Sequence, residues 1–208
     1  MDLAKLKEPF PENEIEWRLQ SCGETDGKIW GRCLAYVTNR AIQNRLDEVV
    51  GAENWKNEFT KGPDGGVLCG LSIKIDGDWV CKYDGAENTD VEAVKGGLSG
   101  AMKRAAATGW GIGRYLYYLD DGWINVCSDG KYGGKTKDNK KFKWNPPALP
   151  SWALPDEDKE FADLSKEVND FIMAGTLKDD FAKKALFYIK KKDVEGLKNV
   201  IKYCKESK

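Results

Sequence analysis

Four stretches of the chain alternate between apolar and polar residues, or are rich in β-branched and aromatic residues, as β-strands are. We expect these strands at residues 28–37, 55–60, 67–75 and 78–83. Asp76 and Gly77, between the last two, form a dipeptide that closes tight hairpins. The last three strands are therefore predicted to form an antiparallel meander.

Apolar residues at intervals of three and four predict helices around these strands. One helix is expected at 39–50, where Thr38 can cap its start and Gly51 can end it. A shorter helix is expected at 11–20, and three more near the C-terminus, within 156–208.

The longest predicted helix begins at Thr89 and ends with the basic pair Lys103 and Arg104. Thr89 and Glu92 have the spacing of a capping box, which marks the helix start. An apolar stripe runs along the helix, and the two cations lie off it. The helix can therefore pack on one side and hold positive charge on another.

Glycines in and after this helix need an explanation. Gly96, Gly97 and Gly100 each cost up to ~1 kcal/mol of helix stability, which indicates close approach by another backbone, with a neighbouring subunit as one candidate. The run 109–113 resembles a nucleotide-binding glycine loop. Since it follows a helix and lacks the G-K-[ST] sequence, we interpret it as a helix C-terminus where glycine allows positive φ.

The order of elements predicts an α+β protein, in which an antiparallel β-meander packs against the long helix as a β-β-β-α core. We expect a core at 1–127 and a small helical C-terminal unit at 156–208. Between them, residues 128–155 are polar and basic and then proline-rich, so they are interpreted as a loop and linker.

Overall charge does not mark a nucleic-acid-binding protein. The net charge is -1 and the pI about 5.8, whereas most autonomous DNA-binding domains are basic. The charges are segregated, however. Residues 131–143 hold six lysines and one acid, residues 156–180 are mainly acidic, and residues 181–208 are mainly basic.

The six cysteines form no C-x-x-C pair and the chain has no histidine, so we expect no metal site and no cofactor. The cysteines are interpreted as small core residues of a reduced, intracellular protein. The N-terminus lacks the apolar stretch of a signal peptide, and no apolar run approaches the roughly 20 residues of a membrane span. We expect a soluble protein with no membrane association.

One hypothesis from the residues is a metal-dependent nuclease that uses Asp76, Asp78 and Asp84 with Lys82. Against it, aspartate is common at hairpin turns for backbone reasons alone, and no clear pair of carboxylates lies beside a lysine on one strand.

A second hypothesis is nucleic-acid binding by Lys95, Lys103 and Arg104, which lie near Arg114 and several aromatic residues. Cations for phosphates and rings for bases are how proteins hold single strands without reading their sequence. An ordinary solvated helix face is the simpler alternative for these cations.

Three stretches carry a resemblance to a known family: EIEWRLQ at 14–20, AYVTNRAIQNRLDEVVGAENW at 35–55 and DGAENTDVEAVKGGLSGAMKRAAATGWGIGRYLY at 84–117. In order and spacing they resemble the Rad52 superfamily of single-strand annealing proteins, and most closely its phage and prophage members of the Sak type. The resemblance covers residues 1–127 and leaves out the helical tail.

The resemblance implies a β-β-β-α core that assembles into rings or helical filaments. It implies binding of single-stranded DNA in an outer groove and annealing of complementary strands without ATP, in recombination and repair. Such a protein is not an enzyme. For a phage or prophage protein, the location would be the cytoplasm of the bacterial host cell.

The resemblance also implies individual DNA contacts, which fall on Arg18, Lys95, Lys103 and Arg104. Eukaryotic members carry a further arginine where this chain has Ala107, and Arg114 is a candidate to supply that charge. Tyr36 and Arg40 align with family residues as well, either as DNA contacts or as structural residues.

Two questions stay open at the level of sequence. A passive single-strand-binding module would have the same basic and aromatic surface, and the residues alone do not separate it from an annealing protein. The unit at 156–208 is a candidate docking site for a host single-strand-binding protein, or a lid or packing element of the oligomer.

Overall fold

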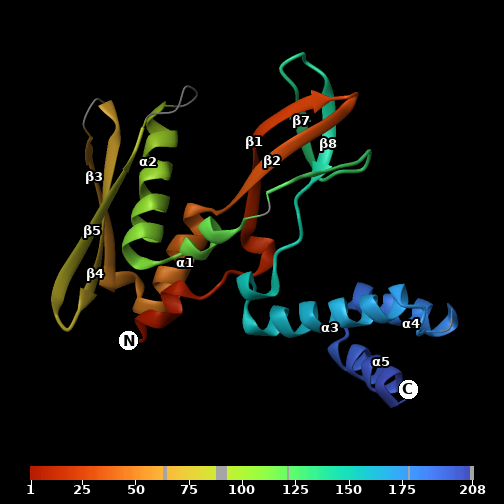
Figure 1. Ribbon diagram of the computed structural model, residues 1–208. Coiled ribbons are helices and arrows are strands. Elements are labelled where there is room, and N and C mark those ends of the chain that lie inside the picture. Colours follow the sequence, from red (N-terminus) through yellow and green to blue (C-terminus); the bar gives the residue numbers. More distant parts are fainter. Residues whose placement is uncertain (63–64, 88–92, 121, 178, 207–208) are drawn as a thin grey trace. The chain divides into compact units, whose positions relative to one another are not determined.

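The computed structural model (Figure 1) describes residues 1–62, 65–87, 93–120, 122–177 and 179–206. The chain forms two compact units, Met1–Ala148 and Leu149–Lys208. Antiparallel sheets and helices make up the first unit, and helices make up the second. The predicted α+β class is confirmed.

The predicted meander is a three-stranded antiparallel sheet formed by β3 (Trp55–Lys61), β4 (Val67–Ile75) and β5 (Asp78–Ala86), with β4 in the centre. Asp76 and Gly77 both have positive φ, 51° and 97°. Two positive φ values in a row suit the right-handed twist of the flanking strands, so the predicted hairpin turn is confirmed.

Helix α2 (Ala93–Arg104) packs on this sheet, which completes the predicted β-β-β-α core (Figure 1). A Cβ added at Gly100 would lie 3.0 Å from the Cβ of Ala86 in β5. The close approach at this glycine is therefore to a strand of the same chain. The predicted capping box at Thr89 lies outside the described residues.

A π-helix, Ala105–Trp110, continues α2 and ends at Gly111, whose φ of 85° lies in the left-handed region, as does the φ of Gly113. This confirms the interpretation of the glycine run as a helix C-terminus. The buried Trp110 donates its indole N–H to the carbonyl of Leu71 at 2.9 Å. The indole therefore anchors the end of the helix to the centre of the sheet.

The N-terminal part of the chain forms a hairpin of β1 (Ile15–Thr25) and β2 (Lys28–Val37). The predicted helix at 11–20 is wrong. Ile15 and Trp17 are buried and Glu16 is exposed, which is the two-residue period of a strand. The pairing of β1 with β2 then supplies its backbone hydrogen bonds. The second predicted strand, 28–37, is confirmed.

Helix α1 (Asn39–Val50) follows β2 as predicted. The Thr38 hydroxyl accepts a hydrogen bond from the backbone N–H of Ala41, and Gly51 ends the helix with a φ of 87°.

A third sheet occupies part of the segment expected to be a loop. Its strands are β6 (Asn125–Val126), β7 (Tyr132–Lys135) and β8 (Lys141–Asn145), with β8 in the centre. The prediction of a loop is wrong for β7 and β8, since buried Phe142 and Trp144 alternate with exposed lysines. The segment contains many lysines and glycines, so its composition indicated a loop although its apolar residues alternate with the period of a strand.

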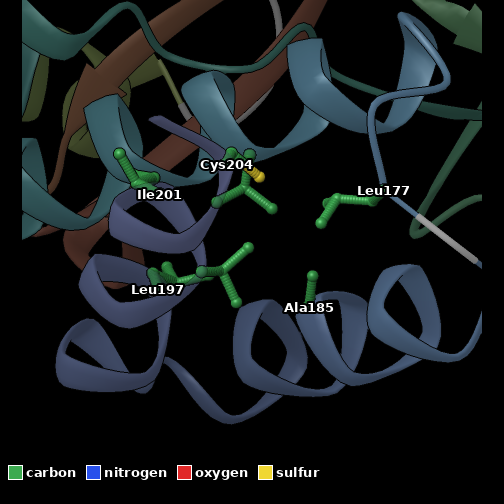
Figure 2. Packing of buried hydrophobic residues seen from close by; sticks show 7 residues of the cluster. Leu177, Ala185, Leu197, Ile201 and Cys204 are labelled. Carbon is green, nitrogen blue, oxygen red and sulfur yellow. The ribbon is translucent and has the colours of Figure 1, made fainter. Parts of the chain in front are cut away.

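The second unit contains α3 (Asp156–Met173), α4 (Asp179–Lys191) and α5 (Val194–Glu206), which confirms the three predicted C-terminal helices. Figure 2 shows their shared core, formed by the buried residues Val168, Leu177, Ala185, Leu197, Val200, Ile201 and Cys204. No helix within the described ranges combines the length and apolar character needed to cross a membrane.

Candidate nucleic-acid interface

An open groove of about 620 Å³ lies between the β1–β2 hairpin and α2. Four of the residues predicted to contact DNA line it, namely Arg18, Tyr36, Lys103 and Arg104. They come from two parts of the sequence that are far apart. The tertiary fold therefore brings together residues of β1, β2 and α2 that only the family resemblance had linked.

The strand register explains how the hairpin contributes to the groove. Arg18 is exposed because it alternates with the buried residues of β1, and it pairs with Leu34. Glu16 lies on the same face and pairs with Tyr36. The hairpin thus presents a cation, a carboxylate and an aromatic ring to α2.

Lys103 is the central cation of the groove. Its ammonium nitrogen lies 4.4 Å from the centre of the Tyr36 ring, a distance typical of a cation–π contact. Burial lowers the pKa of Lys103, the negative charge of Glu16 opposes this shift, and the positive charge of Arg18 adds to it. None of the carboxylates in the described part of the chain lies within ion-pair distance of Lys103. A partly desolvated cation without such a partner is well suited to bind an anion.

Tyr36 is held in place by its hydroxyl, which donates a hydrogen bond to Glu16 Oε2 at 2.8 Å. Burial, together with this bond and the charge of Glu16, raises the pKa of Tyr36 to about 12, so the phenol stays neutral. Sequence reasoning missed Glu16, because a helix was expected at 11–20. On a strand, residues two positions apart share a face, so an expected strand at this place would have put Glu16 beside Arg18.

Arg104 is oriented by Asp84 of β5, whose Oδ1 lies 3.1 Å from its Nε. Burial alone would raise the pKa of Asp84, but hydrogen bonds from Thr108, the backbone of Gly85 and Arg104 hold it below its ordinary value. The Arg104 side chain is still 55% exposed. It can therefore contact a phosphate while it keeps Asp84 as a partner.

Arg114 occupies a different environment. It donates from Nε to the carbonyl of Ala107 at 2.7 Å and from Nη2 to the carbonyl of Thr108 at 2.6 Å. It therefore caps the π-helix and brings its charge to Ala107, the position where the family resemblance implies an additional cation. Its DNA contact stays a prediction.

The two other predicted contacts lie outside the groove lining. Lys95 is exposed on α2 next to Gly96, which does line the groove, and Arg40 is exposed in the first turn of α1. Their roles also stay predictions. Tyr117, one of the aromatic residues that follow Arg114, lines the groove and is 69% exposed, which leaves a ring available for a base.

The three carboxylates of the nuclease hypothesis are not assembled into one site. Asp76 and Asp78 lie at one end of β5, and Asp84 lies six residues from Asp78, about 20 Å along the strand. Asp84 is also bound to Arg104 and Thr108. Over the described residues, no cluster of three histidine, cysteine, aspartate or glutamate side chains has a geometry for metal binding.

Together these features define an α+β protein with an open, cationic and aromatic groove on its β-β-β-α core. The family of Rad52/22 double-strand break repair proteins matches residues 3–129, and the chain belongs to this family. The phage and prophage Sak-type assignment stays a prediction.

Two similar proteins extend the comparison. One is the single-stranded DNA-binding protein DdrA of Deinococcus deserti, 31% identical over 157 residues, which covers 74% of this chain and 71% of the relative. The other is the single-stranded DNA-binding protein DdrA of Deinococcus radiodurans, 31% identical over 159 residues, which covers 74% of this chain and 68% of the relative. No solved structure gives a significant match.

Proposed function

We propose that this protein binds single-stranded DNA in the groove and anneals complementary strands without ATP, in recombination and repair. The observation that carries the proposal is Lys103, a half-buried cation in a groove that it shares with Arg18 and Arg104. Membership of the Rad52/22 family and the names of the two DdrA proteins support single-stranded DNA as the ligand.

The mechanism is physical and requires no covalent step. Arg18, Lys103 and Arg104 neutralise phosphates, while Tyr36 and Tyr117 provide aromatic surface next to them. The backbone is held and the base edges stay exposed. A second strand then meets an ordered template, so part of the ordering entropy is lost before the encounter. The proposal therefore includes no catalytic residue, metal or nucleotide.

Assembly is part of the proposal. A ring or helical filament of identical subunits would repeat the groove along one strand, so that each subunit adds a few phosphate contacts. We expect the protein to act in this form in the cytoplasm of a bacterial host cell.

The proposal predicts that the protein accelerates annealing of two complementary fluorescent oligonucleotides in the presence of a chelator and without nucleotide. The acceleration is expected to disappear at high salt, because each phosphate contact releases counterions. Two non-complementary oligonucleotides are the control. Binding without acceleration would favour the passive single-strand-binding module, and metal-dependent loss of the strands would favour the nuclease.

The role of the C-terminal helical unit stays a prediction. Exposed apolar residues on α4, Leu186 and Phe187, support a docking function, and a host single-strand-binding protein is the proposed partner. Recruitment of that protein by a chain ending at Ala148 would contradict this role.

A further inference from the structure

One face of the β6–β8–β7 sheet carries a group of lysines that the groove does not use. Lys141 and Lys143 alternate along β8 with buried Phe142 and Trp144, so both lysines lie on the opposite, exposed face. Lys135 of β7 lies directly across from Lys141. We call Lys135, Lys141 and Lys143 the lysine face.

The charges of the lysine face are not balanced within the sheet. Like charges directly opposite each other on paired strands are destabilising, and Lys135 and Lys141 form such a pair. The three side chains form no ion pair or hydrogen bond with any residue that the structure describes. The sheet therefore carries an electrostatic cost that a bound polyanion would remove.

The surface around these lysines is open. They line a shallow groove of about 790 Å³ with Gly133, which pairs with Lys143. A Cβ added at Gly133 would meet no atom within 4 Å. The glycine leaves bare backbone between the lysines, and a bulky chain can approach it closely.

The face is also held in a fixed position. On the inner side of the sheet, Tyr132 stacks on Trp144 with 4.8 Å between ring centres. Lys140 forms an ion pair of 2.8 Å with Glu24 of β1, and the Cys22 thiol donates to the carbonyl of Lys135 at 3.3 Å. β7 and the turn before β8 are therefore attached to the β1–β2 hairpin, and the residues that line the lysine face are distinct from those that line the groove.

We propose that the lysine face is a second binding site for a nucleic-acid phosphate backbone. Lys141 and Lys143 are two residues apart on β8, about 6.7 Å along the backbone, and Lys135 lies across the ladder, so the face suits a linear polyanion better than a single small anion. The strand is either the continuation of the one in the groove or a separate strand. The inference rests on the proposed function only in taking a nucleic acid as the ligand.

The test is the salt dependence of binding of a fluorescent oligothymidylate to the full-length chain. Replacing Lys135, Lys141 and Lys143 by glutamine should make the slope of log K against log salt shallower by about 2, since each single-strand phosphate contact contributes about 0.7. A matched control replaces three exposed lysines of the second unit, Lys159, Lys166 and Lys183, by glutamine and should keep the original slope.

A second arm adds a labelled, non-complementary strand to protein already saturated with unlabelled oligothymidylate. If the glutamine variant differs from the unmodified chain only in its capture of this second strand, the lysine face binds a separate strand. If its salt slope for the oligothymidylate changes, the lysine face binds the same strand as the groove. A variant with arginine in place of Lys135, Lys141 and Lys143 should behave as the unmodified chain does in both arms, because it keeps the three positive charges.

The proposal is overturned if the glutamine variant matches the unmodified chain in both arms. It is also overturned if that variant loses only its binding to phosphatidylglycerol vesicles, which would assign the face to a lipid surface. The variant Lys103→Ala with Arg104→Ala separates the two sites. If it binds the first strand normally while the lysine-face variant does not, the assignment of DNA binding to the groove is wrong and its assignment to the lysine face is supported.

Discussion

Replacing Lys103 and Arg104 together by alanine is expected to weaken the binding of single-stranded DNA about 100-fold. A hydrogen bond to a charged group contributes about 1.5–3 kcal/mol, and a contribution near the lower limit from each residue gives about a tenfold loss for each. The slope of log K against log salt should also become shallower by about 1.4, as two phosphate contacts are lost. Fluorescence anisotropy with a labelled oligothymidylate measures both quantities.

The control for this variant is Lys159→Ala with Lys166→Ala, which removes the same charge from the exposed surface of α3. Its affinity should equal that of the unmodified chain. Asp84 keeps its bonds from Thr108 and from the backbone of Gly85 when Arg104 is lost, so the fold should persist. Unchanged DNA binding by a Lys103 and Arg104 variant that still assembles would show that the groove is wrongly assigned.

Replacing Trp110 by alanine is expected to lower the free energy of unfolding of the first unit by about 3–5 kcal/mol, the usual cost of removing a buried aromatic side chain. The indole fills the space between the π-helix and β4, bonds to Leu71, and lies 4.6 Å below the ammonium group of Lys82. Urea denaturation followed by circular dichroism measures the loss.

The matched control for this variant is Trp79→Ala. Trp79 lies on β5, in the sheet to which Trp110 is bonded, but is 45% exposed. Its removal should therefore cost much less. Equal losses for the two variants would contradict the view that Trp110 anchors the helix end that carries Lys103 and Arg104.

Local chemistry made part of this fold predictable. Thr38, Gly51 and the Asp76–Gly77 pair act through their immediate neighbours, and each is found in the predicted role. These signals depend on a few residues that are adjacent in sequence, so a single sequence contains them in full.

The two errors share one physical cause. Residues 11–20 contain the first part of β1, and residues 128–155 contain β7 and β8. In both segments the two-residue period is carried by only a few apolar residues, such as Ile15 and Trp17, or Phe142 and Trp144. Strands are stable because of the strands they pair with, and pairing partners are not visible in a local pattern.

Only the family resemblance connected the residues that line the candidate groove. Lys103 and Arg104 are prominent in the sequence, but nothing in its spacing places Arg18 or Tyr36 beside them, because that contact depends on how the β1–β2 hairpin lies against α2. Glu16, which orients Tyr36 across the β1–β2 hairpin, was missed because a helix was expected at 11–20.

The most direct test of the central claim is photochemical crosslinking of the full-length protein to a single strand that contains 5-iodouracil, with the crosslinked residues identified by mass spectrometry. We expect crosslinks at Tyr36 or Tyr117, the aromatic residues of the groove. Tyr83, which is 63% exposed on β5, provides an internal comparison outside the groove lining. Crosslinks at Tyr83 with none at Tyr36 or Tyr117 would contradict binding of the strand in the groove.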